Sequence, residues 1–135
     1  MTKIIAAHGN CYVATASVGY PLDFMNKLKK AAKMKGPKFI DLLTPCQPGW
    51  DYSSELTIKI AKLAVDTGAW PLYEVHNGKF NLTYKPKKLK PIKEYVTLQR
   101  RFRHLKDKDI KEIQKWVNEE WNRLSKGKFW EAREY

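Results

Sequence analysis

The sequence has 135 residues, of which 43% are hydrophobic, and this length suits one domain with a modest core. The formal net charge of +12 makes nucleic acid a partner to consider, because Lys and Arg neutralise phosphates. No apolar run approaches the roughly 20 residues that cross a bilayer, and residues 1–10 lack the features of a signal peptide. We therefore expect a cytoplasmic protein without a membrane span.

The first predicted elements form a βαβ unit. Residues 2–9 resemble the end of a helix closed by a glycine, and residues 11–17 have the β-branched, glycine-bounded pattern of a buried strand. A helix is predicted from Pro21 to the Gly36-Pro37 pair, with an apolar face of Met25, Leu28, Ala31 and Ala32. Residues 38–44 read as a second buried strand, which should be parallel to the first.

A second helix and a β-hairpin are predicted next. Ser53 or Ser54 can cap a helix that ends at Thr67-Gly68, with an apolar face of Leu56, Ile60, Leu63 and Ala64. Residues 70–75 and 79–84 flank Asn77-Gly78, a pair that supplies the positive φ angles of a two-residue primed turn. These two segments are therefore expected to pair as antiparallel strands.

The last third of the chain carries most of the positive charge. Residues 85–106, which we call the basic segment, contain nine Lys or Arg and one acid, Glu94, and so hold +8 of the +12. Because prolines interrupt this segment, we predict an extended arm held to a surface. Asp109 and Glu112 then have capping-box spacing. They predict an amphipathic helix whose apolar stripe is Ile110, Ile113, Val117, Trp121 and Leu124.

These elements predict a fold of the α/β class. It would contain a partial parallel sheet with a βαβ unit, a β-hairpin and a carboxyl-terminal helical extension. We divide the chain into an α/β region at residues 1–84 and an extension at residues 85–135, made of the basic segment and the amphipathic helix.

Cys46 is the main candidate site residue. A single cysteine is most often a small buried hydrophobe, but Cys46 follows the carboxyl end of a predicted parallel strand, where open α/β sheets bind ligands. Pro45 and Pro48 restrict the backbone, and Gly49 permits the close approach of another group. A disulfide with Cys11 is not expected, because the two cysteines would lie at opposite ends of neighbouring strands.

The sequence shows no complete catalytic constellation. His8, His76 and His104 lack metal-ligand spacing, and structural roles are expected for them. No Ser/His/Asp group, carboxylate pair or phosphate-binding glycine loop can be defended, so no catalytic residue is assigned. Stacking of the tryptophans on bases is the weaker interpretation, because Trp121 falls on the helix stripe and Trp70 at a strand start, which favours burial.

Four stretches of the sequence together resemble a known family. They are IIAAHGNCYVATASVGYPLDFMNKLKKA, GPKFIDLLTPCQPGW, LAVDTGAWPLYEVHNGKFNLTYKP and YVTLQRRFRHL, in this order. They resemble the carboxyl-terminal part of the beta subunit of pyruvate:ferredoxin oxidoreductase and of related 2-oxoacid:ferredoxin oxidoreductases, from Lys3 to about Leu124. Residues 1–84 would then be the carboxyl-terminal part of a thiamine-diphosphate-binding domain.

The resemblance implies an enzyme part. The complete enzyme would decarboxylate a 2-oxoacid such as pyruvate on thiamine diphosphate, pass electrons through a [4Fe-4S] cluster to ferredoxin, and transfer the acyl group to coenzyme A. The cysteine of the family's PC-PGW motif, the last of four cluster ligands, falls on Cys46. Implied partners are the amino-terminal half of the beta subunit, the alpha, gamma and delta subunits, and ferredoxin.

The family's other site motifs have no counterpart in this sequence. These are the other three cluster cysteines and the Gly-Asp-Gly motif for Mg²⁺ and the diphosphate, and Cys11 does not occupy a ligand position. The chain alone is therefore expected to retain no thiamine diphosphate, Mg²⁺ or cluster and to show no turnover. It is also expected to expose a sheet edge and an apolar face where the amino-terminal half would pack.

The alternative is a stand-alone basic protein that contacts RNA or an acidic protein through the basic segment. Binding measured across a salt series separates the two hypotheses, because phosphate contacts weaken steeply with salt. If the chain is an enzyme part, nucleic acid is not an expected partner, and the basic segment would contact a neighbouring subunit or ferredoxin.

Overall fold

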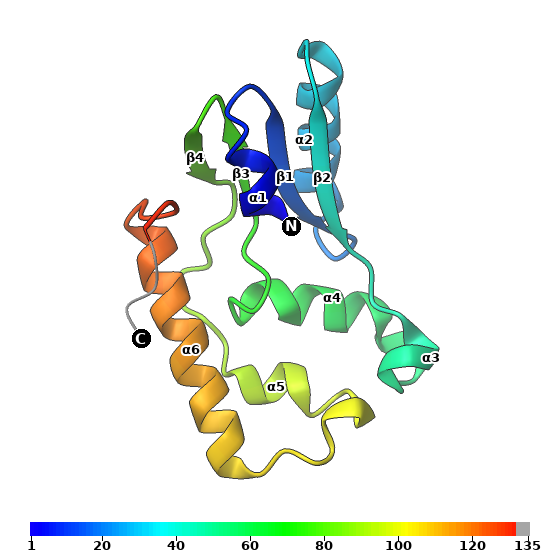
Figure 1. Ribbon diagram of the computed structural model, residues 1–135. Coiled ribbons are helices and arrows are strands. Elements are labelled where there is room, and N and C mark those ends of the chain that lie inside the picture. Colours follow the sequence, from blue (N-terminus) through cyan, green and yellow to red (C-terminus); the bar gives the residue numbers. More distant parts are fainter. Residues whose placement is uncertain (132–135) are drawn as a thin grey trace.

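A four-stranded mixed sheet forms the upper part of the molecule in Figure 1. The computed structural model describes residues 1–131. The strands are ordered β2-β1-β3-β4, and β1 (Tyr12–Ser17) and β2 (Lys38–Leu43) are parallel. β3 (Tyr73–His76) is antiparallel to β1 and to β4 (Lys79–Leu82). The predicted α/β class, the parallel pair and the hairpin are therefore confirmed.

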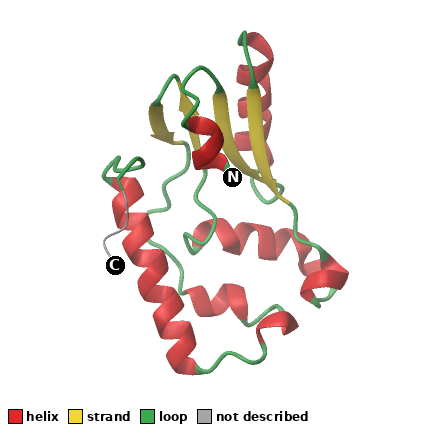
Figure 2. Cartoon of the chain, in the orientation of Figure 1, coloured by secondary structure: helices red, strands yellow, loops and turns green. Residues whose placement is uncertain are grey.

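Helices cover both faces of the sheet, as Figure 2 shows. Every residue of β1 is buried, and its side chains alternate between the two faces. Val13 packs in one cluster with Ala6 of α1 (Thr2–Ala6), whereas Ala14 packs in another with Ala31 of α2 (Pro21–Lys33). The β1-α2-β2 unit predicted from the sequence is thus present, with β1 inside the sheet and β2 at its edge.

The hairpin turn has the predicted geometry, and the carboxyl-terminal segment covers it. Asn77 and Gly78 have φ angles of 49° and 73°, as a two-residue primed turn requires. Phe129 is 1% exposed and stacks on Phe80, with 4.8 Å between the ring centroids. Trp130 donates from its Nε1 to the carbonyl of Gly78 at 3.0 Å.

A second layer of helices lies below the sheet in Figure 1. It contains α4 (Thr57–Asp66), α5 (Ile92–Val96) and α6 (Asp107–Ser125). The helix predicted from Ser53 or Ser54 begins instead as a 3₁₀ turn, η1 (Ser54–Leu56), and neither serine makes a side-chain cap, because the Ser53 hydroxyl bonds Glu55. The shared cluster consists of Tyr52, Ile60, Leu63, Ala64, Ile92, Tyr95 and Val96.

The prediction of an extended basic arm holds for residues 85–91, which form neither helix nor strand, and is wrong from Ile92 onward. The basic segment forms α5 and a 3₁₀ turn, η2 (Arg100–Phe102). Ile92, Tyr95 and Val96 recur at helical spacing between the charged residues, and their burial against α4 outweighs the proline and lysine content. The segment therefore contributes to the core.

Helix α6 begins slightly earlier than predicted. It starts at Asp107, and the carboxylate of Asp109 accepts the backbone N–H of Lys106 at 2.8 Å. Asp109 is thus the third residue of the helix rather than its cap, because its short acidic side chain reaches back to a free N–H. The predicted apolar stripe faces the core but only Leu124 is fully buried. None of the helices in residues 1–131 is long and apolar enough to cross a membrane.

The predicted apolar face of α2 is largely exposed, which corrects the sequence-based expectation. Leu22, Met25 and Leu28 are 81%, 47% and 38% exposed. The helix buries Lys27 instead, whose ammonium donates to the carbonyl of Thr15 at 2.7 Å and to the Asp23 carboxylate at 2.6 Å. Hydrogen bonds to these two acceptors make the burial of a charge tolerable.

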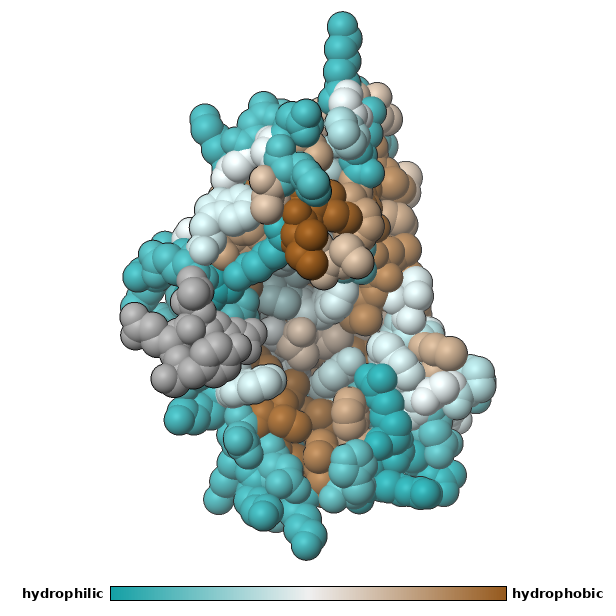
Figure 3. Space-filling model, in the orientation of Figure 1, coloured by the Kyte–Doolittle hydropathy of each residue, from teal (hydrophilic) through white to brown (hydrophobic). Residues whose placement is uncertain are grey.

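The neighbouring β2 is an edge strand that is mostly half-buried. Within residues 1–131 no further strand pairs with its outer side. Figure 3 shows apolar surface along the side of the molecule formed by β2 and α2. The expected open sheet edge and apolar face are therefore present.

Candidate functional site

Cys46 lies just beyond the carboxyl end of β2. The strand ends at Leu43, and Cys46 precedes a one-turn helix, α3 (Gln47–Trp50). Its backbone is extended, with φ −96° and ψ 101°, and its carbonyl accepts the Trp50 N–H at 2.9 Å. The thiol side chain is exposed. The structure thus places the candidate residue at the rim of the sheet, as the sequence predicted.

Gly49 leaves space beside the Cys46 sulfur. A Cβ added at Gly49 would lie 3.2 Å from the Cys46 Sγ, closer than ordinary van der Waals contact. A residue with a Cβ at this position would require the sulfur to move by a small amount. The glycine therefore leaves one side of the thiol without a neighbouring Cβ.

The Cys46 turn is anchored on the lower helices by the residues that follow it. Asp51 ends α3 in the left-handed region with φ 53°, and its carbonyl accepts the Arg100 N–H at 2.9 Å. Tyr52 is 5% exposed and packs in the cluster of α4 and α5. Trp50 is half-buried in the same cluster. The turn therefore joins the sheet rim to the helical layer.

The other candidate ligands do not gather at Cys46. Cys11 is buried and its Sγ donates to the carbonyl of Ile5 at 3.1 Å, and both cysteines are free, as predicted. His8 and His104 are exposed, and the ring of His76 lies edge-on to Tyr12. Residues 1–131 contain no group of three or more Cys, His, Asp or Glu that could hold a metal ion.

Cys46 can supply one ligand, and residues 1–131 do not complete a metal site around it. Cys46 offers a soft sulfur ligand at an exposed rim, with space on its Gly49 side. Cysteine thiolates are the usual ligands of iron-sulfur clusters, and a closed structural zinc site would need further ligands nearby. The remaining ligands would have to come from another segment.

A buried polar network under α2 was missed by sequence reasoning. Glu74 of β3 accepts the Tyr12 hydroxyl at 2.8 Å and the Lys30 ammonium at 2.6 Å. Burial opposes ionisation of Glu74, but the hydrogen bonds from Lys30 and Tyr12 outweigh it and hold the pKa of the carboxyl below its ordinary value. Burial raises the pKa of Tyr12 and lowers that of Lys27. The available signal was Glu74 itself, an acidic residue within a predicted strand.

Two cavities accompany these features. One of about 340 Å³ lies beside the polar network, and its charged side chains already pair with one another. A second, of about 410 Å³, lies between α6 and the sheet and is lined by Trp70, Asp41 and Ile113, among others. Neither brings together a nucleophile, a base and an orienting group. They therefore do not define a catalytic centre.

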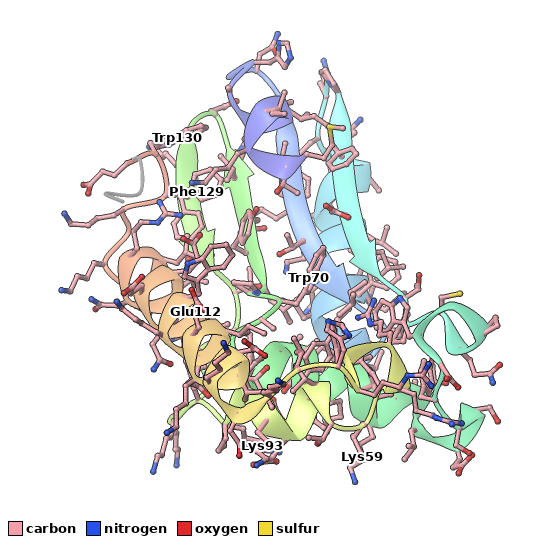
Figure 4. The ribbon with its side chains drawn as sticks, turned by 60° about the horizontal axis from the view of Figure 1, so that its bottom comes forward. Lys59, Trp70, Lys93, Glu112, Phe129 and Trp130 are labelled. Carbon is pink, nitrogen blue, oxygen red and sulfur yellow. The ribbon has the colours of Figure 1, made fainter. Side chains whose placement is uncertain are left out.

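The tryptophans divide between burial and exposure. Trp70 lies between the sheet and the lower helices in Figure 4, and its Nε1 donates to the carbonyl of Ala16 at 2.9 Å. It precedes β3 by three residues instead of starting the strand. Trp121 is half-buried, whereas Trp116 and Trp130 are largely exposed. Trp70 and Trp121 are both half-buried, so the predicted burial is confirmed in part for each.

The chain is similar in sequence to subunits of known oxidoreductases. No protein-family model matches it. It is 58% identical over 119 residues to pyruvate synthase subunit PorB of Methanocaldococcus jannaschii and 51% identical over 125 residues to ketoisovalerate oxidoreductase subunit VorB of Pyrococcus abyssi. The chain is a relative of these oxidoreductase subunits. It is also 43% identical over 129 residues to pyruvate synthase subunit PorB of Thermotoga maritima.

These matches cover most of the chain but a minor part of each relative. They include 88%, 91% and 92% of the chain and 40% of each of the three subunits. The predicted resemblance to the carboxyl-terminal part of such beta subunits is confirmed. A match of 119 residues in a chain of 135 must include residues 17–119, and therefore both Cys46 and the η2 turn.

Proposed function

We propose that the chain is part of the beta subunit of a 2-oxoacid:ferredoxin oxidoreductase. The complete enzyme would convert a 2-oxoacid, pyruvate in the simplest case, into an acyl-coenzyme A and pass the electrons to ferredoxin. The observation that carries the proposal is the 58% identity to a pyruvate synthase subunit over 88% of the chain. The ketoisovalerate oxidoreductase relatives make a branched 2-oxoacid the competing substrate.

Within this enzyme, Cys46 would be one thiolate ligand of a [4Fe-4S] cluster. Its exposure at the rim of the sheet and the space kept by Gly49 support this role. A bound cluster would supply one-electron transfer at this position. The other three ligands, thiamine diphosphate and Mg²⁺ would be held by the amino-terminal part of the subunit, which packs beside this chain. The alpha, gamma and delta subunits would complete the assembly.

The ligand role is tested by Cys46→Ala in the chain assembled with the amino-terminal part and the other subunits. We expect the variant to lose cluster iron and ferredoxin reduction, because an alanine cannot ligate iron. The matched control is Cys11→Ala, which removes a buried thiol that donates to the carbonyl of Ile5. It should retain the iron. If Cys46→Ala binds iron and reduces ferredoxin like the unchanged protein, the assignment is wrong.

A further inference from the structure

Arg101 belongs to the basic segment, yet its side chain contacts the Cys46 turn. The guanidinium carbon of Arg101 lies 3.8 Å from the centroid of the Trp50 ring and 4.5 Å from that of Phe102. The side chain is half-buried. Its planar cation is therefore stacked on one aromatic ring of α3 and on one of its own η2 turn.

The far side of this contact is fixed to the protein core. Arg101 donates from its Nε to the side-chain oxygen of Gln99 at 2.9 Å. Gln99 is 1% exposed and donates from its Nε2 to the carbonyl of Tyr95 in α5 at 2.8 Å. Arg101 is thus held by a buried amide and does not move freely over the indole.

Trp50 connects the Arg101 contact to Cys46 through a backbone hydrogen bond. The backbone N–H of Trp50 donates to the Cys46 carbonyl at 2.9 Å and closes the only turn of α3. A four-residue helix is not stable alone, because the first turn costs more conformational entropy than one hydrogen bond returns. The turn therefore depends on tertiary contacts. At its last residue, Trp50, these are the packing against the cluster of α4 and α5 and the stack with Arg101.

We propose that Arg101 is a positioning residue that holds the Cys46 turn in its ligating conformation through Trp50. The proposal rests on the proposed role of Cys46 and extends it. It also gives the basic segment a specific task, which is to brace the rim of the sheet from the helical layer. Lysine should replace Arg101 poorly, because a flexible ammonium lacks the planar surface that stacks on the indole.

Backbone hydrogen exchange in the 135-residue chain tests the restraint without any cofactor. In Arg101→Met, the amide of Trp50 should exchange about five-fold faster, since local opening reports the loss of one stacking contact. Arg101→Lys should show most of this effect. Arg103→Met is the matched control, because it removes an exposed cation from the same segment, and it should leave the Trp50 amide unchanged. Amides of β1 show whether each variant is folded.

The assembled complex provides the second measurement. Arg101→Met should release iron to a chelator about five-fold faster than Arg103→Met while Cys46 is intact. The proposal is overturned if exchange at Trp50 is the same in Arg101→Met as in the unchanged chain, or if Arg103→Met accelerates it equally. If Cys46→Ala keeps its iron, the ligand role fails instead, and the exchange data still decide whether Arg101 holds the turn.

Discussion

The two outer strands of the sheet, β4 and β2, differ in how far other segments of the chain pack around them. At the β4 end, Phe129 stacks on Phe80 and Trp130 donates to the carbonyl of Gly78, so residues 129 and 130 pack on one face and the turn of the hairpin. At the β2 edge, the strand is half-buried, and Leu22 and Met25 of the neighbouring helix are exposed. A free edge beside apolar side chains is a template for pairing with another segment.

The difference indicates on which side of the sheet further protein can pack. The chain spans about 40% of the length of the curated relatives it matches. Phe129 and Trp130 already cover one face and the turn of the β4 hairpin, whereas the β2 edge and α2 leave apolar surface on which the remaining length can pack. Cys46 follows β2 directly, so the proposed ligand lies on the side of the sheet that remains open.

Removal of the Phe129 ring should produce the largest change in stability. Phe129 is 1% exposed and contacts Tyr73 and Phe80. Phe129→Ala should lower the free energy of unfolding by about 3–4 kcal/mol, because it removes a buried ring and leaves a cavity. Denaturant titration measures this loss. Trp130→Ala, at a residue 48% exposed, should cost about 1 kcal/mol or less. Equal losses in the two variants would mean that the buried ring of Phe129 is not the main contact that stabilises the hairpin.

The polar network between the two edges should give stability a dependence on pH. The pKa of Glu74 is held below its ordinary value, so its carboxylate stabilises the fold above the unfolded-state pKa. This contribution should disappear as the pH falls through the lower, folded-state pKa. Glu74→Gln should cost about 1 kcal/mol at neutral pH and flatten the acid limb of a stability–pH curve. Glu119→Gln, at an exposed position, should leave that limb unchanged.

Local patterns in the sequence were sufficient for some elements and not for others. The hairpin followed from Asn77-Gly78, and the position of Cys46 followed from the strand before it, because both depend on neighbouring residues. The burial of Lys27 depends on the carbonyl of Thr15, a partner that helical periodicity does not reveal. The contact of Arg101 with Trp50 joins segments far apart in sequence, so no local pattern predicts it.

The open edge is tested by polar substitutions on α2. Because Leu22 and Met25 already face solvent, Leu22→Ser combined with Met25→Ser should change the free energy of unfolding by no more than about 0.5 kcal/mol. The same double variant should lower self-association of the chain and its binding to the amino-terminal part of the subunit, as sedimentation would show. Ile58→Ser, at an apolar position on α4 that is 55% exposed, is the control. If it reduces association as much, general surface hydrophobicity explains the result and the β2 side has no special role.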